Sequence, residues 1–310
     1  MSAFRRTVTV RLKPDTTDER YDERPMSMRS KATRTVALIV VGLLLSAGRS
    51  AADEIRVMTS GAFTAALLDV TPEFERATRH KIIVVTTTIG TGATSIPSRL
   101  QRREPADVVI VAADSLDEFI KAGTVAAGSR VDLARSAIGM AVRAGAPVPD
   151  VSTVEAFTRA LLDAKSIAYS ASVSGVYLST ELFQRLGIAD RVLPKSRRIE
   201  GERVGAVVAR GDAEIGFQQV SELLPVPGIT LTGPLPPGVQ RVTVYAAGIA
   251  SHSASPEAAK ALVNFLASPA AAPAVRKSGM EPAMVAVSPQ PIARRARPEP
   301  VAPRLGSGRP

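Results

Sequence analysis

Residues 105–114 read PADVVIVAAD, and this stretch decides how the sequence folds. Its centre, 106–112, is apolar apart from Asp107 and rich in β-branched residues, a composition typical of a strand. A strand without polar alternation indicates a parallel sheet that is covered on both faces. We therefore expect a buried strand here, followed by a helix that Asp114 caps and Gly123 ends.

Strands and helices alternate outward from this segment in both directions. Phe63, Ala66, Leu67, Val70 and Phe74 recur at helical spacing, and Pro72 is expected to kink or restart that helix. Further helices are expected near 96–102, 154–161, 175–186 and 204–209, and after Ser255-Pro256 and Ser268-Pro269. Strands are expected at 54–58, 81–88, 136–142, 166–169, 214–217 and 241–248. This alternation predicts an α/β protein with largely parallel sheets.

The segments that follow four of these strands share one chemistry. They are rich in hydroxyl, amide and glycine residues and carry no charge: 59–62, 89–95, 170–175 and 218–221. Ligands of open α/β sheets bind outside the carboxyl ends of the strands. Neutral hydroxyls, backbone N–H groups and helix N-termini suit a small desolvated anion. Helix capping alone is the alternative explanation for any single segment.

Composition excludes several classes of function. The 310 residues contain no cysteine and only two histidines, His80 and His252, which excludes disulfides, thiolate metal sites and cysteine catalysis and argues against a multi-histidine metal centre. There is no GxSxG elbow and no phosphate loop, and Gly90-Thr91-Gly92 lacks the third glycine of a dinucleotide fingerprint. No convincing acid, base or nucleophile stands out, so we expect no enzyme, no cofactor and no metal.

The net charge of +10 is located at the two ends of the chain. Residues 53–282 carry 24 basic and 23 acidic side chains, which leaves the central part almost neutral. The charge therefore gives no reason to expect a nucleic-acid partner.

Residues 35–47 (TVALIVVGLLLSA) follow three basic residues and precede small ones, the layout of a secretory signal. The run is shorter than a membrane span needs, so we expect cleavage before Asp53 and no stable membrane insertion; an uncleaved anchor is the alternative. The true start is Met1, Met26 or Met28. We thus interpret 1–52 as an N-terminal extension with a signal peptide, and the Pro- and Arg-rich segment 283–310 as a disordered tail.

Several motifs together resemble a known family. In order they are TSGAFTAAL, PEFERAT, EPADVVIVAAD, SIAYS, ELFQRLGIAD, GDAEIGF and SPEAAKALVNFLASPAA with KSGMEP. They resemble the molybdate-binding proteins of bacterial ABC importers, which are type II periplasmic binding proteins. The resemblance implies two α/β lobes joined by two crossover strands, near 136–142 and 242–248. Lobe 1 would comprise 53–135 and 246–282, and lobe 2 would comprise 136–245.

The resemblance also implies an oxyanion site. The family's first serine falls on Ala62, with Ser60 two residues earlier and Gly61 leaving room for close backbone approach. Its second serine falls near Thr94 and Ser95. Two backbone contacts fall on Ser174 with Gly175 and near Gly201, and the family's tyrosine falls on Gln219. Because Ala62 and Gln219 replace two donors, the bound anion stays open.

The resulting prediction is a monomeric periplasmic receptor. It would capture a small oxyanion, molybdate or tungstate, between two lobes and deliver it to the permease of an ABC importer without turnover. The alternatives are a receptor for a different small anion or organic acid, a sensory receptor without a permease, and an exported enzyme on the same fold.

Overall fold

The computed structural model describes residues 52–87 and 92–283. The predicted signal peptide and C-terminal tail, apart from their boundary residues, lie outside these ranges, as does the turn at 88–91. Within the described ranges, no helix is long and apolar enough to span a membrane.

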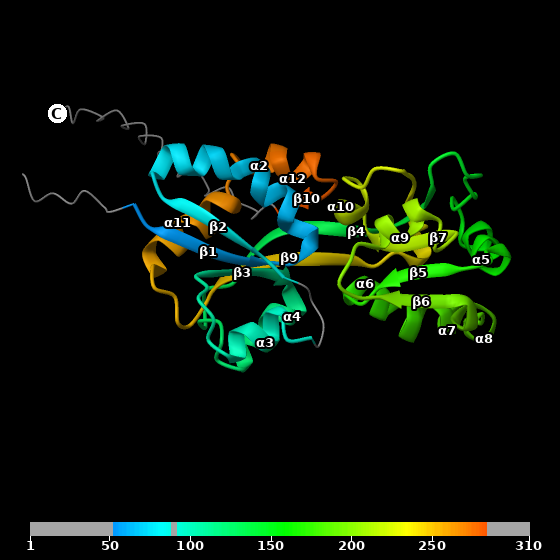
Figure 1. Cartoon of the computed structure of the whole chain (residues 1–310), viewed down its shortest axis with the longest axis horizontal. Helices are drawn as coiled ribbons and strands as arrows, with labels where there is room; N and C mark the ends of the chain where they lie inside the picture. Colours follow the sequence, from blue (N-terminus) through cyan, green and yellow to red (C-terminus); the bar gives the residue numbers. More distant parts are fainter. Residues whose placement is uncertain (1–51, 88–91, 284–310) are drawn as a thin grey trace, which may run out of the picture. The chain divides into compact units, whose positions relative to one another are not determined.

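The first lobe is a sheet covered by helices on both faces (Figure 1). Parallel strands β2 (Lys81–Thr86), β1 (Glu54–Thr59) and β3 (Val108–Ala112) are followed by antiparallel β9 (Val242–Ile249). One face packs against α2 (Gly61–Thr78), α11 (Pro256–Leu266) and α12 (Ala272–Lys277), and the other against α3 (Ile96–Gln101) and α4 (Ala113–Lys121). All five residues of β3 are buried, which confirms the central strand that the apolar run predicts.

The second lobe has the same layered plan. Its sheet joins parallel β6 (Ser196–Ile199), β5 (Ile167–Ser170) and β7 (Ile215–Gln219) to antiparallel β4 (Val131–Arg143), which also pairs with β8 (Ile229–Pro234). The remaining elements of this lobe are α5 (Val154–Asp163), α6 (Val173–Tyr177), the π-helical η1 (Leu178–Leu182), α7 (Phe183–Arg185), α8 (Ala189–Val192), η2 (Leu193–Lys195), α9 (Val204–Arg210), α10 (Val220–Leu223) and η3 (Pro237–Val239).

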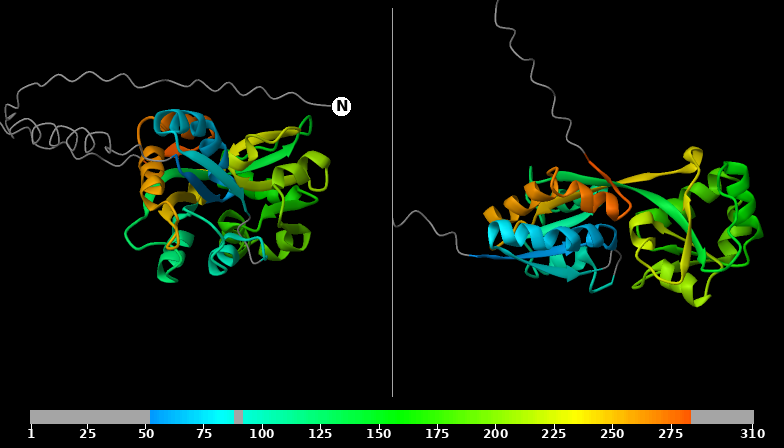
Figure 2. Two further views of the ribbon diagram at one scale, coloured as in Figure 1. Left: turned by 60° about the vertical axis from the view of Figure 1, so that its left-hand side comes forward. Right: turned by 90° about the horizontal axis from the view of Figure 1, so that it is seen from above.

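Two strands connect the lobes (Figure 2). The first half of β4, from Val131 to Ala137, pairs with β9, and its second half, from Ile138, pairs with β7 of the second lobe. The short strand β10 (Glu281–Pro282) pairs with β4 as well. This is the type II periplasmic-binding-protein fold expected from the sequence. The predicted lobe boundaries stay a prediction, because β4 runs through the sheets of both lobes.

Two local predictions are wrong, and a third is wrong in part. Pro72 does not restart the helix, because α2 runs unbroken from Gly61 to Thr78; the predicted kink stays a prediction. The carbonyl that Pro72 leaves without a helical donor is that of Leu68, a residue whose side chain is 54% exposed, so this face is open to solvent. Asp114 lies in the first turn of α4 rather than at its cap, where its charge still favours the helix N-terminus. The last helix begins at Ala272, three residues later than Ser268-Pro269 indicates.

Candidate active site between the lobes

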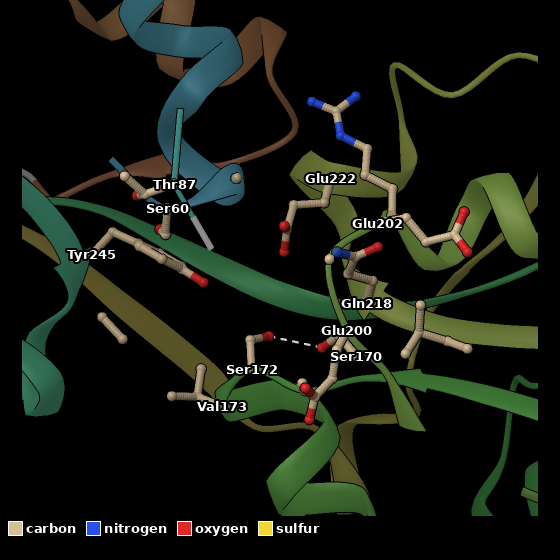
Figure 3. A pocket seen from close by; sticks show the side chains of 16 residues that line it. Ser60, Thr87, Ser170, Ser172, Val173, Glu200, Glu202, Gln218, Glu222 and Tyr245 are labelled. Carbon is tan, nitrogen blue, oxygen red and sulfur yellow. Dashed lines mark hydrogen bonds between the residues drawn. The ribbon is translucent and has the colours of Figure 1, made fainter. Parts of the chain in front are cut away.

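A cavity of about 190 Å³ lies where the carboxyl ends of the parallel strands of both lobes meet (Figure 3). Nearly every residue that lines it ends or directly follows a strand. The first lobe contributes Ser60, Gly61, Thr87, Ala112 and Tyr245, and the second contributes Ser170, Ala171, Ser172, Val173, Ile199, Glu200, Gly201, Glu202, Arg203, Gln218 and Glu222. The topology thus brings together segments that are far apart in the sequence.

The first lobe presents uncharged groups to the cavity. Ser60 occupies the cap position of the 18-residue helix α2, but its hydroxyl makes no capping bond and is buried without a partner among the residues that the structure describes. The hydroxyl of Thr87 donates to the Thr59 carbonyl at 3.1 Å. The Tyr245 hydroxyl points into the cavity (Figure 3). A buried polar atom without a partner is costly, so Ser60 indicates a place prepared for a ligand atom.

Three serines of the second lobe form a connected group. The Ser170 hydroxyl lies 2.7 Å from that of Ser172 and 3.0 Å from that of Ser174, and Ser172 and Ser174 are 3.3 Å apart. Ser172 lines the cavity, whereas Ser174 is buried behind it. Because each hydroxyl both donates and accepts, the group can turn one proton toward a ligand and stay satisfied.

Glu222 is the buried carboxyl group of the cavity. It projects from α10 toward the first lobe, and a Cβ added to Gly61 would overlap its Oε1 atom. Burial raises the pKa of Glu222 to about 7, while the positive charge of Arg203 and the side-chain amide of Gln218 lower it. The Gln218 Oε1 atom accepts a hydrogen bond from the Val204 backbone at 2.9 Å, which fixes that amide beside the carboxyl group.

The other two glutamates of the cavity have different surroundings. Glu200 pairs with Arg198 at 3.2 Å, and Glu202 pairs with Arg210 at 2.9 Å. Both carboxylates are half exposed, and the hydrogen bond from Arg210 lowers the pKa of Glu202. Arg203 makes no ion pair with any residue in the described ranges and lines the cavity. The site therefore combines one carboxyl group that titrates near neutrality with one arginine available to an anion.

Of the site residues predicted from the sequence, Ser60, Gly61 and Gly201 line this cavity. Ala62 is buried in the core of the first lobe, directly behind them. Ser174 and Gly175 lie beneath the wall of the cavity, and a Cβ on Gly175 would overlap the Ser170 carbonyl.

The other three predicted residues lie outside the lining. Thr94 is exposed, and Ser95 caps α3 by accepting from the Ser98 backbone at 3.4 Å. Gln219 is fully buried where β4 and β9 cross. With its amide nitrogen turned toward β4, it donates to the Ser136 hydroxyl at 2.9 Å and accepts from the Thr243 hydroxyl at 3.0 Å. Ligand contacts by these three residues stay predictions.

Sequence reasoning missed the groups that give the site its chemistry. Glu222 and Tyr245 were not singled out, and Gln218 was noted only as part of a polar segment. One signal was present: Gln218 and Glu222 stand close to the carboxyl end of a parallel strand, the edge at which ligands of such sheets bind. Within the described ranges, no group of three or more potential metal-ligating side chains occurs.

The fold and the interlobe cavity define a solute-binding protein. The sequence pattern of bacterial extracellular solute-binding proteins matches residues 55–281, and the chain belongs to this family.

Two named relatives differ in what they do. The chain is 47% identical to an aconitate isomerase of a Pseudomonas species over 229 residues, which cover 74% of this chain and 87% of the relative. It is 28% identical to the molybdate-binding protein ModA of Azotobacter vinelandii over 267 residues, which cover 81% of this chain and 98% of the relative. The solved structure of the periplasmic molybdate-binding protein from that organism matches with a TM-score of 0.60 at 18% identity, over 73% of this chain and 98% of that one.

Proposed function

We propose that the protein is an exported isomerase that interconverts cis- and trans-aconitate. The observation that carries the proposal is Glu222, a buried carboxyl group in the cavity with a pKa raised to about 7. The relative that is 47% identical and named aconitate isomerase supports the same substrate. This proposal takes the place of the receptor without turnover that the sequence alone predicts.

The reaction needs only a base and a well-ordered substrate. Aconitate has three carboxylates on a three-carbon chain, with a double bond to one arm and a methylene group in the other. Glu222 removes one methylene proton, and the C–H electron pair spreads over the three-carbon unit. The proton returns to the other terminal carbon, so the double bond moves to the arm that lost it. Atoms and electrons balance, and the cavity determines the new double-bond geometry by how it holds that arm.

The raised pKa suits Glu222 to this task. A carboxylate at its ordinary pKa of 4.5 is a weak base, whereas one near 7 is stronger and still substantially ionised at neutral pH. Its protonated form then returns the proton without a second group. Strongly perturbed acids in clefts are typical of active sites.

The remaining walls suit three carboxylates. Arg203 offers a charged fork, Ser60 and Ser172 offer hydroxyl donors, and the N-terminus of the long helix α2 favours negative charge. The volume of about 190 Å³ is small, as a six-carbon acid requires.

A second candidate function is an organic-acid receptor of the periplasm that passes its ligand to an ABC-importer permease. The family match and the unpartnered Ser60 at the helix N-terminus favour it. Molybdate or tungstate is the other class of ligand for such a receptor, and the 28% identical molybdate-binding relative supports it.

The test is to incubate the purified chain with each isomer of aconitate separately and to follow the other by liquid chromatography. We expect both to reach the same equilibrium mixture. Thermal unfolding with molybdate, tungstate, sulfate and aconitate runs in parallel. Stabilisation by one of these anions without conversion of aconitate would overturn the isomerase and support the receptor.

A further inference from the structure

Tyr245 faces Glu222 from the opposite lobe. It lies on β9, where it is paired with Ala112 of β3 and Ala134 of β4, so neighbouring strands hold its backbone on both sides. Its ring is packed in the core of the first lobe and is 3% exposed. Only its hydroxyl reaches the cavity, and it points toward the Glu222 side (Figure 3).

The hydroxyl of Tyr245 differs in its hydrogen bonding from that of Tyr177, a second tyrosine with a buried ring. Tyr177 is also 3% exposed, and its hydroxyl donates to the Val239 carbonyl at 2.8 Å and accepts from Arg185 at 3.2 Å. The Tyr245 hydroxyl opens on the cavity and makes no hydrogen bond with any residue in the described ranges, whereas the Ser60 hydroxyl on the same wall is buried and has none there either. Tyrosine hydroxyls on buried rings ordinarily find a partner. Two unpartnered donors on one wall indicate a ligand atom that takes their hydrogen bonds.

The surroundings keep Tyr245 a donor. Burial and the negative charge of Glu222 both raise the pKa of the Tyr245 hydroxyl well above its usual value. The phenol therefore stays protonated while Glu222 is ionised. A neutral donor held rigidly in a buried site stabilises charge that develops on an oxygen in the transition state.

We propose that Tyr245 is a catalytic residue whose hydroxyl, with that of Ser60, donates hydrogen bonds to the substrate carboxylate on which negative charge accumulates. This role rests on the proposed function. When Glu222 removes the methylene proton, the C–H electron pair moves into the adjoining carboxylate and the allylic carbons. Tyr245 keeps its own proton throughout, and Glu222 holds the abstracted proton until it returns to the other carbon.

The test compares Tyr245→Phe with Tyr177→Phe in the full chain. Both variants remove one hydroxyl from an equally buried ring, but only the first removes it from the cavity. We expect Tyr245→Phe to lower kcat roughly 100-fold, as loss of one transition-state donor does, with KM changed less than about threefold. Tyr177→Phe should leave kcat within about twofold of the wild type. Ser60→Ala should lower kcat in the same direction, and it serves as the second variant if Tyr245→Phe folds poorly.

A binding measurement separates catalysis from affinity. Propane-1,2,3-tricarboxylate resembles the substrate, whereas 3-nitropropane-1,2-dicarboxylate, as its nitronate, resembles the charge-rich intermediate. Tyr245→Phe should weaken the nitronate at least about tenfold more than the tricarboxylate, because only transition-state-like charge uses its hydrogen bond.

The outcomes are distinct. Wild-type kcat in Tyr245→Phe overturns the role of Tyr245 and leaves the isomerase standing. Equal weakening of both compounds makes Tyr245 a binding residue only and also overturns its catalytic role. A wild-type protein that converts neither isomer of aconitate overturns both proposals.

Discussion

The two walls of the cavity differ in kind. Ser60, Thr87 and Tyr245 make the first lobe's wall uncharged, whereas the second lobe's wall has four ionisable side chains, those of Glu200, Glu202, Arg203 and Glu222. A receptor for an anion needs only the first kind of wall, because neutral donors bind an anion without reacting with it. The buried carboxyl group of Glu222 on the facing wall is what the proposed proton transfer needs. Under the proposed function, a fold that captures an anion becomes a catalyst because one acid of the second lobe is buried in the cleft.

The same contrast exists within the second lobe. Glu200 and Glu202 pair with surface arginines, whereas Glu222 is buried against Gly61. All three residues are glutamates, and only their surroundings differ. Burial raises the pKa of Glu222, and a charged partner lowers that of Glu202.

The largest expected effect is that of Glu222→Gln. Loss of the base should lower the isomerisation rate by about 10³-fold, within the range of general-base catalysis. The substrate should still bind, because the amide keeps the shape of the acid. The matched control is Glu202→Gln, which removes an arginine-paired glutamate of the same cavity and should leave the rate nearly unchanged. Similar rates in the two variants would remove the distinction between the glutamates.

The stability of the protein should depend on pH through Glu222. Its pKa is about 7 when folded and 4.5 ordinarily, so between these values the folded chain binds the extra proton. The contribution of this proton to the free energy of unfolding is fully present below pH 4.5. It is lost as the pH rises to about 7, and the total loss is roughly 3 kcal/mol. The groups facing Glu222 are Arg203 from the start of α9, Gln218 from β7 and Tyr245 from β9.

Urea unfolding at pH 5 and pH 8 measures this dependence. Glu222→Gln should lack it and be more stable than the wild type at pH 8. A wild type and a variant whose stabilities change in parallel between the two pH values would show that Glu222 has no raised pKa.

Gly61→Ala should disturb the contact between the two walls of the cavity, where Gly61 of the first lobe meets Glu222 of the second. The new methyl group would overlap Oε1 of Glu222 and move the carboxyl group, whereas a helix tolerates alanine at this position. We expect the rate to fall on the order of 10- to 100-fold, the effect of a small misplacement, with the melting temperature preserved. Glu222→Asp shortens the acid and so makes room for the methyl group. The rate of the double variant Gly61→Ala with Glu222→Asp should therefore fall by less than the product of the two single decreases. Gly92→Ala, where no described atom lies near the new methyl group, is the control.

Arg203→Gln should have the smallest effect. It removes one charge-assisted contact with a substrate carboxylate at an exposed position, so affinity should fall about tenfold. Added salt should weaken binding to the wild type more than to the variant. Arg197→Gln, an exposed arginine of β6 that does not line the cavity, should bind aconitate normally. Calorimetric titration measures the affinity of each variant for aconitate. Equal losses of affinity in Arg203→Gln and Arg197→Gln would assign the effect to net charge alone.

Much of the fold follows from local sequence. The segment 106–112, apolar apart from Asp107, predicts a strand buried on both faces, and the polar segments after the strands predict where the cavity lies. Ser60 and Gly61 were found in this way, whereas Gly201 was predicted from the family resemblance.

The chemistry of the cavity follows from tertiary contacts instead. Glu222 is perturbed only because α10 carries it against Gly61 of the other lobe. Tyr245 lies in an apolar strand, where an aromatic residue ordinarily indicates core. Gln219 was expected at the site, but Gln218 lines the cavity, since neighbouring strand residues face opposite sides and an error of one position changes the face.

Proton NMR of trans-aconitate with the full chain in deuterium oxide tests the central claim most directly. If Glu222 moves a proton within the cavity, signals of the cis isomer should appear in the wild-type sample, any deuterium taken up should enter only the two terminal carbons, and Glu222→Gln should show neither change. An unchanged trans-aconitate spectrum with the wild type, although the compound raises the melting temperature, would contradict the account and make the protein a receptor.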